Sequence, residues 1–142
     1  RLEEATELLG RRYRLPGTVG HGDERGRTLG FPTANVISDT RRCIPANGVY
    51  ATWLHARSRW WPAATSIGTR PTFDGRTRTV EAFVLDFDGD LYDADVALEF
   101  VARLREERAF PDAESLIARM HEDVAAVRAL LSTAAPPPAA SP

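Results

Sequence analysis

Residues 26–35 combine conformational freedom, positive charge and small oxygen ligands, in the order Gly-Arg-Thr-Leu-Gly-Phe-Pro-Thr-Ala-Asn. The glycines of segment 20–30 allow its backbone N–H groups to turn toward one anion. Arg27 adds a guanidinium whose donors match phosphate oxygens. Thr33 and Asn35 would point the same way along a strand, and a hydroxyl with an amide oxygen suits a hard cation that keeps most of its waters. These are the parts of a nucleotide-phosphate and magnesium site.

Glycine spacing alone also fits a second interpretation, in which a glycine-rich hairpin has a polar tip that is simply solvated. The Walker sequence Gly-x-x-x-x-Gly-Lys-Ser/Thr is absent from the chain, and no Gly-x-Gly-x-x-Gly opens a helix. A phosphate-binding function therefore needs support from other parts of the sequence.

A second candidate for chemistry is Glu81. Alternation along the predicted strand 79–87 places its carboxylate on the same side as Phe83, Leu85 and Phe87. Partial burial beside such neighbours would disfavour the charged carboxylate and make the residue a useful base. A rim glutamate in a surface salt bridge fits the pattern equally well.

These residues need a scaffold, and the chain offers short strand-like segments separated by turn residues, which favour an antiparallel β-barrel or sandwich over a βαβ fold. The predicted strands are 13–19, 33–37, 48–56, 61–67, 79–87 and 96–104. Hairpin tips are expected at 57–59 and 88–90. One long helix is predicted from its N-cap Asp112 to Leu131, with an apolar stripe suited to core packing.

Composition narrows the functional class. The 142 residues, of which 43% are hydrophobic, fit one globular domain. A net charge of -2 lacks the basic excess of proteins that bind nucleic acid or anionic membranes, and no apolar run is long enough for a membrane span. The single cysteine, Cys43, excludes an internal disulfide and is expected to be a small buried side chain. We therefore expect a cytoplasmic protein with no nucleic-acid or membrane partner.

Further short motifs follow the glycine-rich segment. They are Gly48-Val49-Tyr50-Ala51, Ser66-Ile67-Gly68-Thr69-Arg70-Pro71-Thr72-Phe73, Val80-Glu81, Asp90-Leu91-Tyr92 and Leu104-Arg105-Glu106-Glu107. Together with the highly specific Pro-Thr-Ala-Asn element, they resemble the riboflavin kinases, above all the kinase module of bacterial bifunctional riboflavin kinase/FAD synthetases. The resemblance covers roughly residues 15 to 131. It implies a mainly β fold, a closed six-stranded antiparallel Greek-key barrel with a C-terminal α-helix.

The resemblance implies an ATP:riboflavin 5′-phosphotransferase, which transfers the γ-phosphate of ATP to the ribityl 5′-hydroxyl of riboflavin and gives FMN and ADP. It assigns the catalytic base to Glu81, and the ligands of Mg²⁺ to Thr33 and Asn35. The ATP-binding residues that it implies are Gly22, Arg27, Gly30, Thr33, Val84, Asp86 and Tyr92. Without the resemblance, Val84 is equally well interpreted as core and Tyr92 as a turn aromatic.

The resemblance assigns flavin binding to Arg105, Arg108 and Phe110, which precede the predicted helix. Guanidinium planes and a phenyl ring can stack on an isoalloxazine and hydrogen-bond to its carbonyls. Taken alone, residues 105–108 also fit a solvated charge run. The family usually has glycine after Asp-Leu-Tyr, whereas this chain has Asp93, a residue type that tolerates the left-handed conformation.

The two ends of the chain are expected to differ from its middle. Residues 1–12 are predicted to form a helical connector, a remnant of the link to an absent adenylyltransferase module, and residues 13–133 to form the riboflavin kinase domain. Residues 134–142, rich in proline and alanine, are expected to be disordered. The chain begins without methionine, so we expect a module whose parent protein also carries the adenylyltransferase.

Two other functions fit parts of the sequence. A non-catalytic flavin-binding β-barrel module would explain the aromatic residues and arginines, but it would not need Thr33 and Asn35 beside a glycine-rich loop. A nucleic-acid module of the OB type would share a small barrel, but the acidic charge balance is against it.

Overall fold

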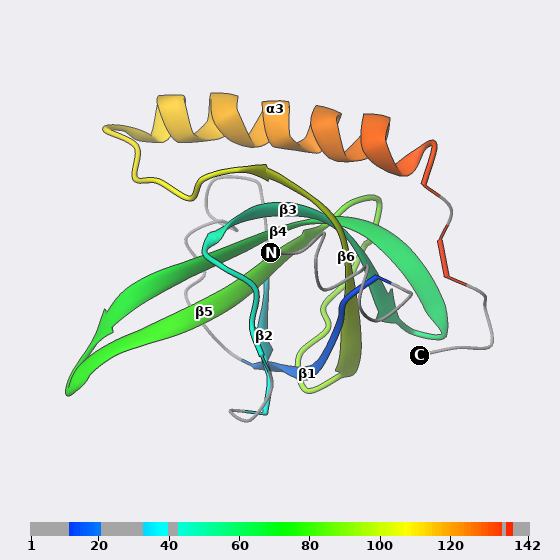
Figure 1. The fold of residues 1–142 in the computed structure, drawn as a ribbon, viewed down its shortest axis with the longest axis horizontal. Helices are drawn as coiled ribbons and strands as arrows, with labels where there is room; N and C mark the ends of the chain where they lie inside the picture. The colour runs from blue at the N-terminus through cyan, green and yellow to red at the C-terminus, as the bar shows by residue number, and fades with distance from the viewer. Residues whose placement is uncertain (1–11, 21–32, 40–42, 135, 138–142) are drawn as a thin grey trace.

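The computed structural model describes residues 12–20, 33–39, 43–134 and 136–137. In these ranges the chain forms six strands followed by one helix (Figure 1). They are β1 (Arg14–Gly20), β2 (Ala34–Ile37), β3 (Gly48–Ala56), β4 (Arg59–Thr72), β5 (Gly75–Val84), β6 (Asp95–Arg105) and α3 (Ala113–Leu131).

The strands close into an antiparallel barrel in the order β1-β2-β5-β4-β3-β6. Strand β1 completes the closure because it pairs with β2 on one side, where Val19 faces Val36, and with β6 on the other, where Leu15 faces Leu98. The predicted fold class, a closed six-stranded antiparallel barrel with a C-terminal helix, is confirmed.

The barrel interior is filled by alternate residues of the strands. Val80 and Ala82 of β5 lie in the same buried cluster as Leu54 and Leu98. Phe100 is fully buried, and its ring meets that of Tyr50 edge-on at 5.2 Å between centroids. The alternation leaves the opposite face of each strand for the outside of the barrel.

Helix α3 covers part of that outer face, across β3 and β4 (Figure 1). It begins where the carboxylate of Asp112 accepts a hydrogen bond from the backbone N–H of Ser115 at 2.7 Å, as the predicted N-cap requires. Val127 and Leu131 are buried in a second apolar cluster that includes Trp53 and Leu85. The helix therefore forms one wall above the outer surface of the barrel.

Strands β4 and β5 are longer than the sequence predicts, and their hairpin projects beyond the barrel (Figure 1). The ladder continues from the Gly68–Thr79 pair to the Thr72–Gly75 pair, through residues that carry no strong apolar alternation. At its other end β5 stops at Val84, because Asp86 takes a positive φ of 62°. Phe87 consequently packs against the interior cluster, so its predicted place on the side of Glu81 is wrong.

Other local predictions have different outcomes. Asp93 adopts the left-handed conformation with a φ of 65°, as its replacement of the family's glycine implied. Cys43 is exposed, so the prediction that it is buried is wrong. It opens segment 43–47, in which Ile44 packs against the interior cluster and the carbonyl oxygens of residues 43–45 accept hydrogen bonds from Tyr13 and Arg78.

The two termini are only partly described. The predicted connector 1–12 lies outside the described residues except for its last position. At the other end, Ala134 packs against the second apolar cluster and Pro137 is buried. In the described part of the chain, no helix is long and apolar enough to cross a membrane.

Candidate active site

Three polar residues form a row across β2, β5 and β4, because the strand register places Asn35 and Ser66 on either side of Glu81. Cross-strand partners in an antiparallel sheet share a face. Since Val80 and Ala82 point into the barrel, this row lies on the outer face. The structure therefore places Asn35 and Glu81, two of the predicted site residues, side by side on that face.

The Glu81 carboxylate is 24% exposed and has two described neighbours. The Thr33 hydroxyl donates to its Oε1 at 3.4 Å, and Nη2 of Arg70 lies 3.8 Å from its Oε2. A guanidinium at this distance stabilises the negatively charged carboxylate. Phe83 lines the same cavity, so Glu81 has the predicted aromatic neighbour and also the ion pair of the alternative interpretation. Alternation along one strand could not reveal the cation, because Arg70 stands on the next strand.

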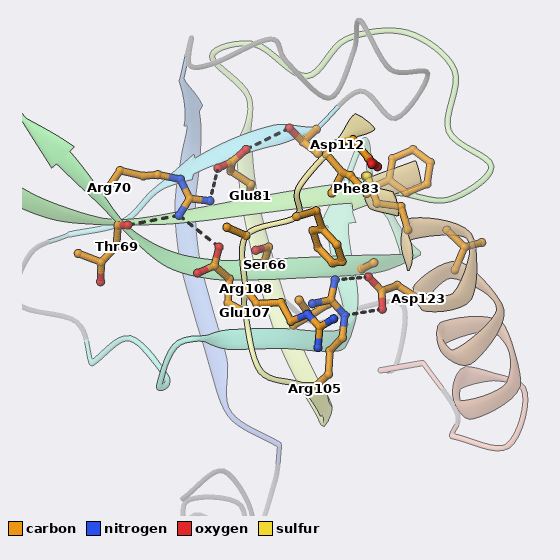
Figure 2. A pocket seen from close by; sticks show the side chains of 18 residues that line it. Ser66, Thr69, Arg70, Glu81, Phe83, Arg105, Glu107, Arg108, Asp112 and Asp123 are labelled. Atoms are coloured by element: carbon orange, nitrogen blue, oxygen red, sulfur yellow. Dashed lines mark hydrogen bonds and ion pairs between the residues drawn. The ribbon is translucent and has the colours of Figure 1, made fainter. Parts of the chain in front are cut away.

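A cavity of about 460 Å³ lies above this row, between the outer face of the barrel and the start of α3 (Figure 2). It is lined by Glu81 and Thr33 at one end and, at the other, by residues 107–110 and Asp112 of the connection between β6 and α3. Its size falls within the range of small-molecule sites. All three residues that were predicted to bind flavin line it, namely Arg105, Arg108 and Phe110.

The flavin-site candidates are already held in place by one another and by α3. The guanidinium carbons of Arg105 and Arg108 lie 5.7 and 5.5 Å from the centre of the Phe110 ring. Nε and Nη2 of Arg105 donate to the two carboxylate oxygens of Asp123 at 2.9 and 2.7 Å. With exposures of 12% for Arg105 and 9% for Asp123, this two-pronged pair is largely shielded from water.

A second cavity of about 260 Å³ adjoins the first and shares Thr33 and Phe83 with it. Three of the predicted ATP-binding residues line it, namely Val84, Asp86 and Tyr92. The Asp86 carboxylate itself accepts hydrogen bonds from both Nη atoms of Arg128 at 3.0 and 2.9 Å. These hydrogen bonds lower the pKa of Asp86, and they pair its carboxylate with Arg128 of α3.

The donor set near Glu81 is compatible with Mg²⁺. The Thr33 hydroxyl gives its proton to Glu81 and so keeps oxygen lone pairs for a cation, and the Asn35 amide is adjacent. Within the described ranges there is no group of three or more His, Cys, Asp or Glu side chains that could hold a metal ion. A sparse set of neutral oxygens suits an ion that keeps most of its waters and binds phosphates.

Three predicted nucleotide residues, Gly22, Arg27 and Gly30, lie outside the described residues. Conversely, sequence reasoning gave no role to Arg70, Glu107 or Asp123, although all three line the larger cavity. Asp123 carried a signal, because an acidic residue on the apolar stripe of a helix calls for a buried partner. Arg70 and Glu107 lie within quoted motifs, but no spacing rule joins two residues that are 37 positions apart.

Comparisons with known proteins agree with this architecture. Residues 9–131 match the family model of flavokinase, described as riboflavin kinase. A bifunctional riboflavin kinase/FMN adenylyltransferase of Pseudomonas fluorescens is 43% identical over 132 residues, which cover 92% of this chain and 42% of that protein. The chain thus spans less than half the length of this curated relative.

Solved structures show the same fold. Riboflavin kinase from Trypanosoma brucei aligns with a TM-score of 0.64 at 28% identity, covering 84% of this chain and 80% of that chain. A Streptococcus pneumoniae structure named macrolide-efflux protein aligns with a TM-score of 0.84 at 34% identity, covering 89% of this chain and 42% of that chain. The word efflux occurs only in the name of that structure, whereas the family model and the curated relative both name riboflavin kinase.

Proposed function

The chain belongs to the riboflavin kinase family, and we propose that it transfers the γ-phosphate of ATP to the ribityl 5′-hydroxyl of riboflavin, giving FMN and ADP. The observation that best supports this reaction is the pair of cavities that meet at Thr33 and Phe83, with Glu81 in the wall of the larger one. Two substrates bound side by side would bring hydroxyl and phosphate together at this shared wall. Phosphoryl transfer requires mainly such alignment and the neutralisation of charge.

Glu81 is the proposed base. Its carboxylate would accept the proton of the ribityl hydroxyl as that oxygen attacks the phosphorus in line with the leaving ADP oxygen. The Thr33 hydrogen bond and the Arg70 guanidinium restrict the orientation of the carboxylate. Thr33 and Asn35 would hold a Mg²⁺ ion, whose chemistry when bound is to neutralise the negative charge of the phosphates.

The larger cavity is the proposed flavin site. The Phe110 ring and the guanidinium of Arg108 would stack on or border the isoalloxazine. Arg105 would donate to its carbonyls with the hydrogens that are not bound to Asp123 or to the carbonyl oxygen of Glu106. The pairing with Asp123 supports this role, because a guanidinium that is fixed before binding loses little conformational freedom when the ligand arrives.

The smaller cavity is the proposed nucleotide site. Val84 and Tyr92 would contact the adenine, and Asp86 would shape the rim of the cavity through its left-handed backbone. Gly22, Arg27 and Gly30 would cover the phosphates, as the family resemblance implies. We further propose that the parent protein carries an adenylyltransferase, as the bifunctional relatives do.

The decisive experiment incubates the purified chain with riboflavin, ATP and Mg²⁺ and measures FMN by chromatography. Glu81→Gln keeps the side-chain shape but removes the base, so kcat should fall by at least about 100-fold. The dissociation constant of riboflavin, measured by flavin fluorescence, should stay within about twofold, because the carboxylate acts on the hydroxyl proton rather than on the ring.

Glu106→Gln is the matched control, because Glu106 is exposed and its change removes the same charge from the neighbouring segment. That variant should keep wild-type turnover. FMN formation by Glu81→Gln at the wild-type rate would refute the assignment of the base. A wild-type chain that binds riboflavin but forms no FMN would instead establish the alternative, a non-catalytic flavin-binding module.

A further inference from the structure

We infer that Arg70 is a positioning residue that ties the proposed catalytic base to the proposed flavin-binding segment through one guanidinium. The inference rests on the proposed function. Arg70 stands on β4, Glu81 on β5, and Glu107 in the connection between β6 and α3. Figure 2 shows Arg70 reaching toward Glu81 on one side and Glu107 on the other, at the edge of the larger cavity.

The contacts of the guanidinium define this arrangement. Nη1 donates to Oε2 of Glu107 at 3.3 Å and to the carbonyl oxygen of Thr69 at 3.3 Å. Nη2 lies 3.8 Å from Oε2 of Glu81. The contact with its neighbour's carbonyl restrains the side chain, so that its two nitrogens face two carboxylates from different elements. Removing the guanidinium would leave both carboxylates without this shared cation.

The absence of a side chain at Gly68 leaves room for the link from Glu81 through Arg70 to Glu107, called the Arg70 bridge below. A Cβ placed on Gly68 would lie 2.5 Å from Nη1 of Arg70 and 3.0 Å from the carboxyl carbon of Glu107. Such distances are shorter than van der Waals contact, so the side-chain ends would have to move. The Gly68→Ala change therefore offers a way to displace the bridge while both charged residues remain in the chain.

Glu107 connects the Arg70 bridge to the proposed flavin site, because it directly precedes two of the flavin-binding candidates. Glu107 is followed by Arg108 and Phe110, which line the same cavity. When Arg70 holds Glu107, it also holds the start of the connection 106–112 near the outer face of β4. Without Arg70, repulsion between the carboxylates of Glu81 and Glu107 would favour a greater separation of the base from the flavin-binding segment.

This role differs from that of an ordinary surface ion pair. Arg70 is 42% exposed, so the two contacts should contribute little to the free energy of unfolding. A misplacement of about 1 Å at a reacting group can nevertheless lower turnover strongly. We therefore expect the loss of Arg70 to appear in kcat and in flavin affinity, with little change in the melting temperature.

The test compares Arg70→Met, Arg70→Lys, Glu107→Gln and the Arg70→Met/Glu107→Gln double variant by kcat, KM for ATP and riboflavin affinity. Arg70→Met should lower kcat about tenfold and weaken riboflavin binding about threefold, with KM for ATP within about twofold of wild type. Arg70→Lys keeps the charge and should recover part of the loss. Glu107→Gln should weaken riboflavin binding more than it lowers kcat.

The double variant measures the coupling, and its loss in kcat/KM should be clearly smaller than the product of the two single losses. Gly68→Ala should shift kcat and riboflavin affinity in the same direction as Arg70→Met. Arg76→Met serves as the control, because Arg76 is an exposed arginine on the same hairpin, and it should behave as wild type.

Wild-type kcat and riboflavin affinity in Arg70→Met would overturn the inference, as would multiplicative losses in the double variant. Equal loss in Arg70→Lys and Arg70→Met would also argue against a positioning charge. These results leave the proposed function intact as long as the wild-type chain makes FMN. A chain that makes no FMN refutes the proposed function, while fluorescence titration still reports whether Arg70 and Glu107 act together on flavin binding.

Discussion

Two aspartates in the segment between β5 and β6 adopt backbone angles that glycine adopts more easily. Asp86 has a φ of 62° and Asp93 a φ of 65°. Each conformation is used by the fold, since the backbone N–H of Asp93 donates to the carbonyl oxygen of Val19 at 2.7 Å, and the carboxylate of Asp86 meets Arg128. These two residues bracket the loop that lines the smaller cavity, so their backbone strain is a property of the proposed nucleotide site.

Asp93 allows a test of this strain. Asp93→Val places a β-branched side chain in the left-handed region and should lower the free energy of unfolding by about 1–2 kcal/mol. Asp93→Gly should leave stability near wild type, because glycine reaches this conformation without a steric penalty. Denaturant unfolding measures both effects. Asp88→Val is the control, as Asp88 is exposed in the same loop and has no positive φ; an equal loss there would show that backbone conformation at Asp93 is not the cause.

At the same scale, the surroundings of Glu81 show which part of a site a sequence can predict. Strand alternation correctly places Glu81 and Phe83 on one face, because side-chain direction in a strand depends only on position. It cannot reveal that Arg70 lies across the neighbouring strand or that Glu107 closes in from a connection, since those contacts depend on strand register and on the path of a loop. The chemical environment of a base is set mainly by such distant residues.

Among the elements, α3 connects most of the site. Its Asp123 holds Arg105 at the larger cavity, and Arg128 in its last turn holds Asp86 at the smaller one. Arg128 near the helix C-terminus is also favoured by the helix dipole. The pKa of Arg128 is raised by its hydrogen bonds to Asp86, and the same contact lowers the pKa of Asp86.

The start of α3 gives a pH-dependent prediction. Hydrogen bonds from Ser115 lower the pKa of Asp112 below 3.8, so folding favours its charged form. The resulting stabilisation is fully present above about pH 3.8 and is lost as the pH falls through the lower folded-state value. Asp112→Ala should therefore melt a few degrees below wild type at pH 5 to 7, and this difference should shrink in acid.

Thermal unfolding followed by circular dichroism between pH 2.5 and 7 measures this difference without ligand. The Asp86–Arg128 pair titrates in the same direction in both proteins, so it cancels in the comparison. Asp112→Asn is the control, because asparagine caps helices about as well as aspartate without a titrating charge. A gap between wild type and Asp112→Ala that stays constant down to pH 2.5 would contradict the role of the carboxylate.

The sequence predicts the ends of a strand or helix where an apolar pattern stops there. The predicted strand 48–56 agrees with β3 at both ends, and the predicted helix agrees with α3 and its cap. The predicted strands 61–67 and 79–87 differ from β4 and β5, whose outer halves pair through Thr, Arg and Gly residues. Backbone hydrogen bonds hold that hairpin together, and they leave no apolar period in the sequence.

For the whole molecule, the important feature is that two cavities adjoin on one side of a closed barrel. Phe83 and Thr33 line both of them, whereas Phe110 lines the larger and Val84 the smaller. If the two proposed substrates occupy these cavities, a change at the shared wall should affect the binding of both, and a change at either outer wall should affect only one. This division can be measured without turnover.

Phe83→Leu should weaken the binding of both riboflavin and ADP by about fivefold, because the smaller side chain contacts less of each ligand. Phe110→Ala should weaken riboflavin binding alone, and Val84→Ala should weaken ADP binding alone. Flavin fluorescence and calorimetric titration with ADP and Mg²⁺ measure the two affinities separately. A Phe83→Leu variant that loses affinity for only one ligand would contradict the shared wall.

The closure of the barrel also has a consequence for folding during translation. Arg14 of β1 forms its ion pair with Glu99 of β6 across 85 positions of sequence. At the usual speed of translation, β1 must wait on the order of 10 s for this partner strand. During that interval the edge of β1 that pairs with β6 has no partner strand. Nascent chains should therefore depend on chaperones mainly before β6 emerges from the ribosome.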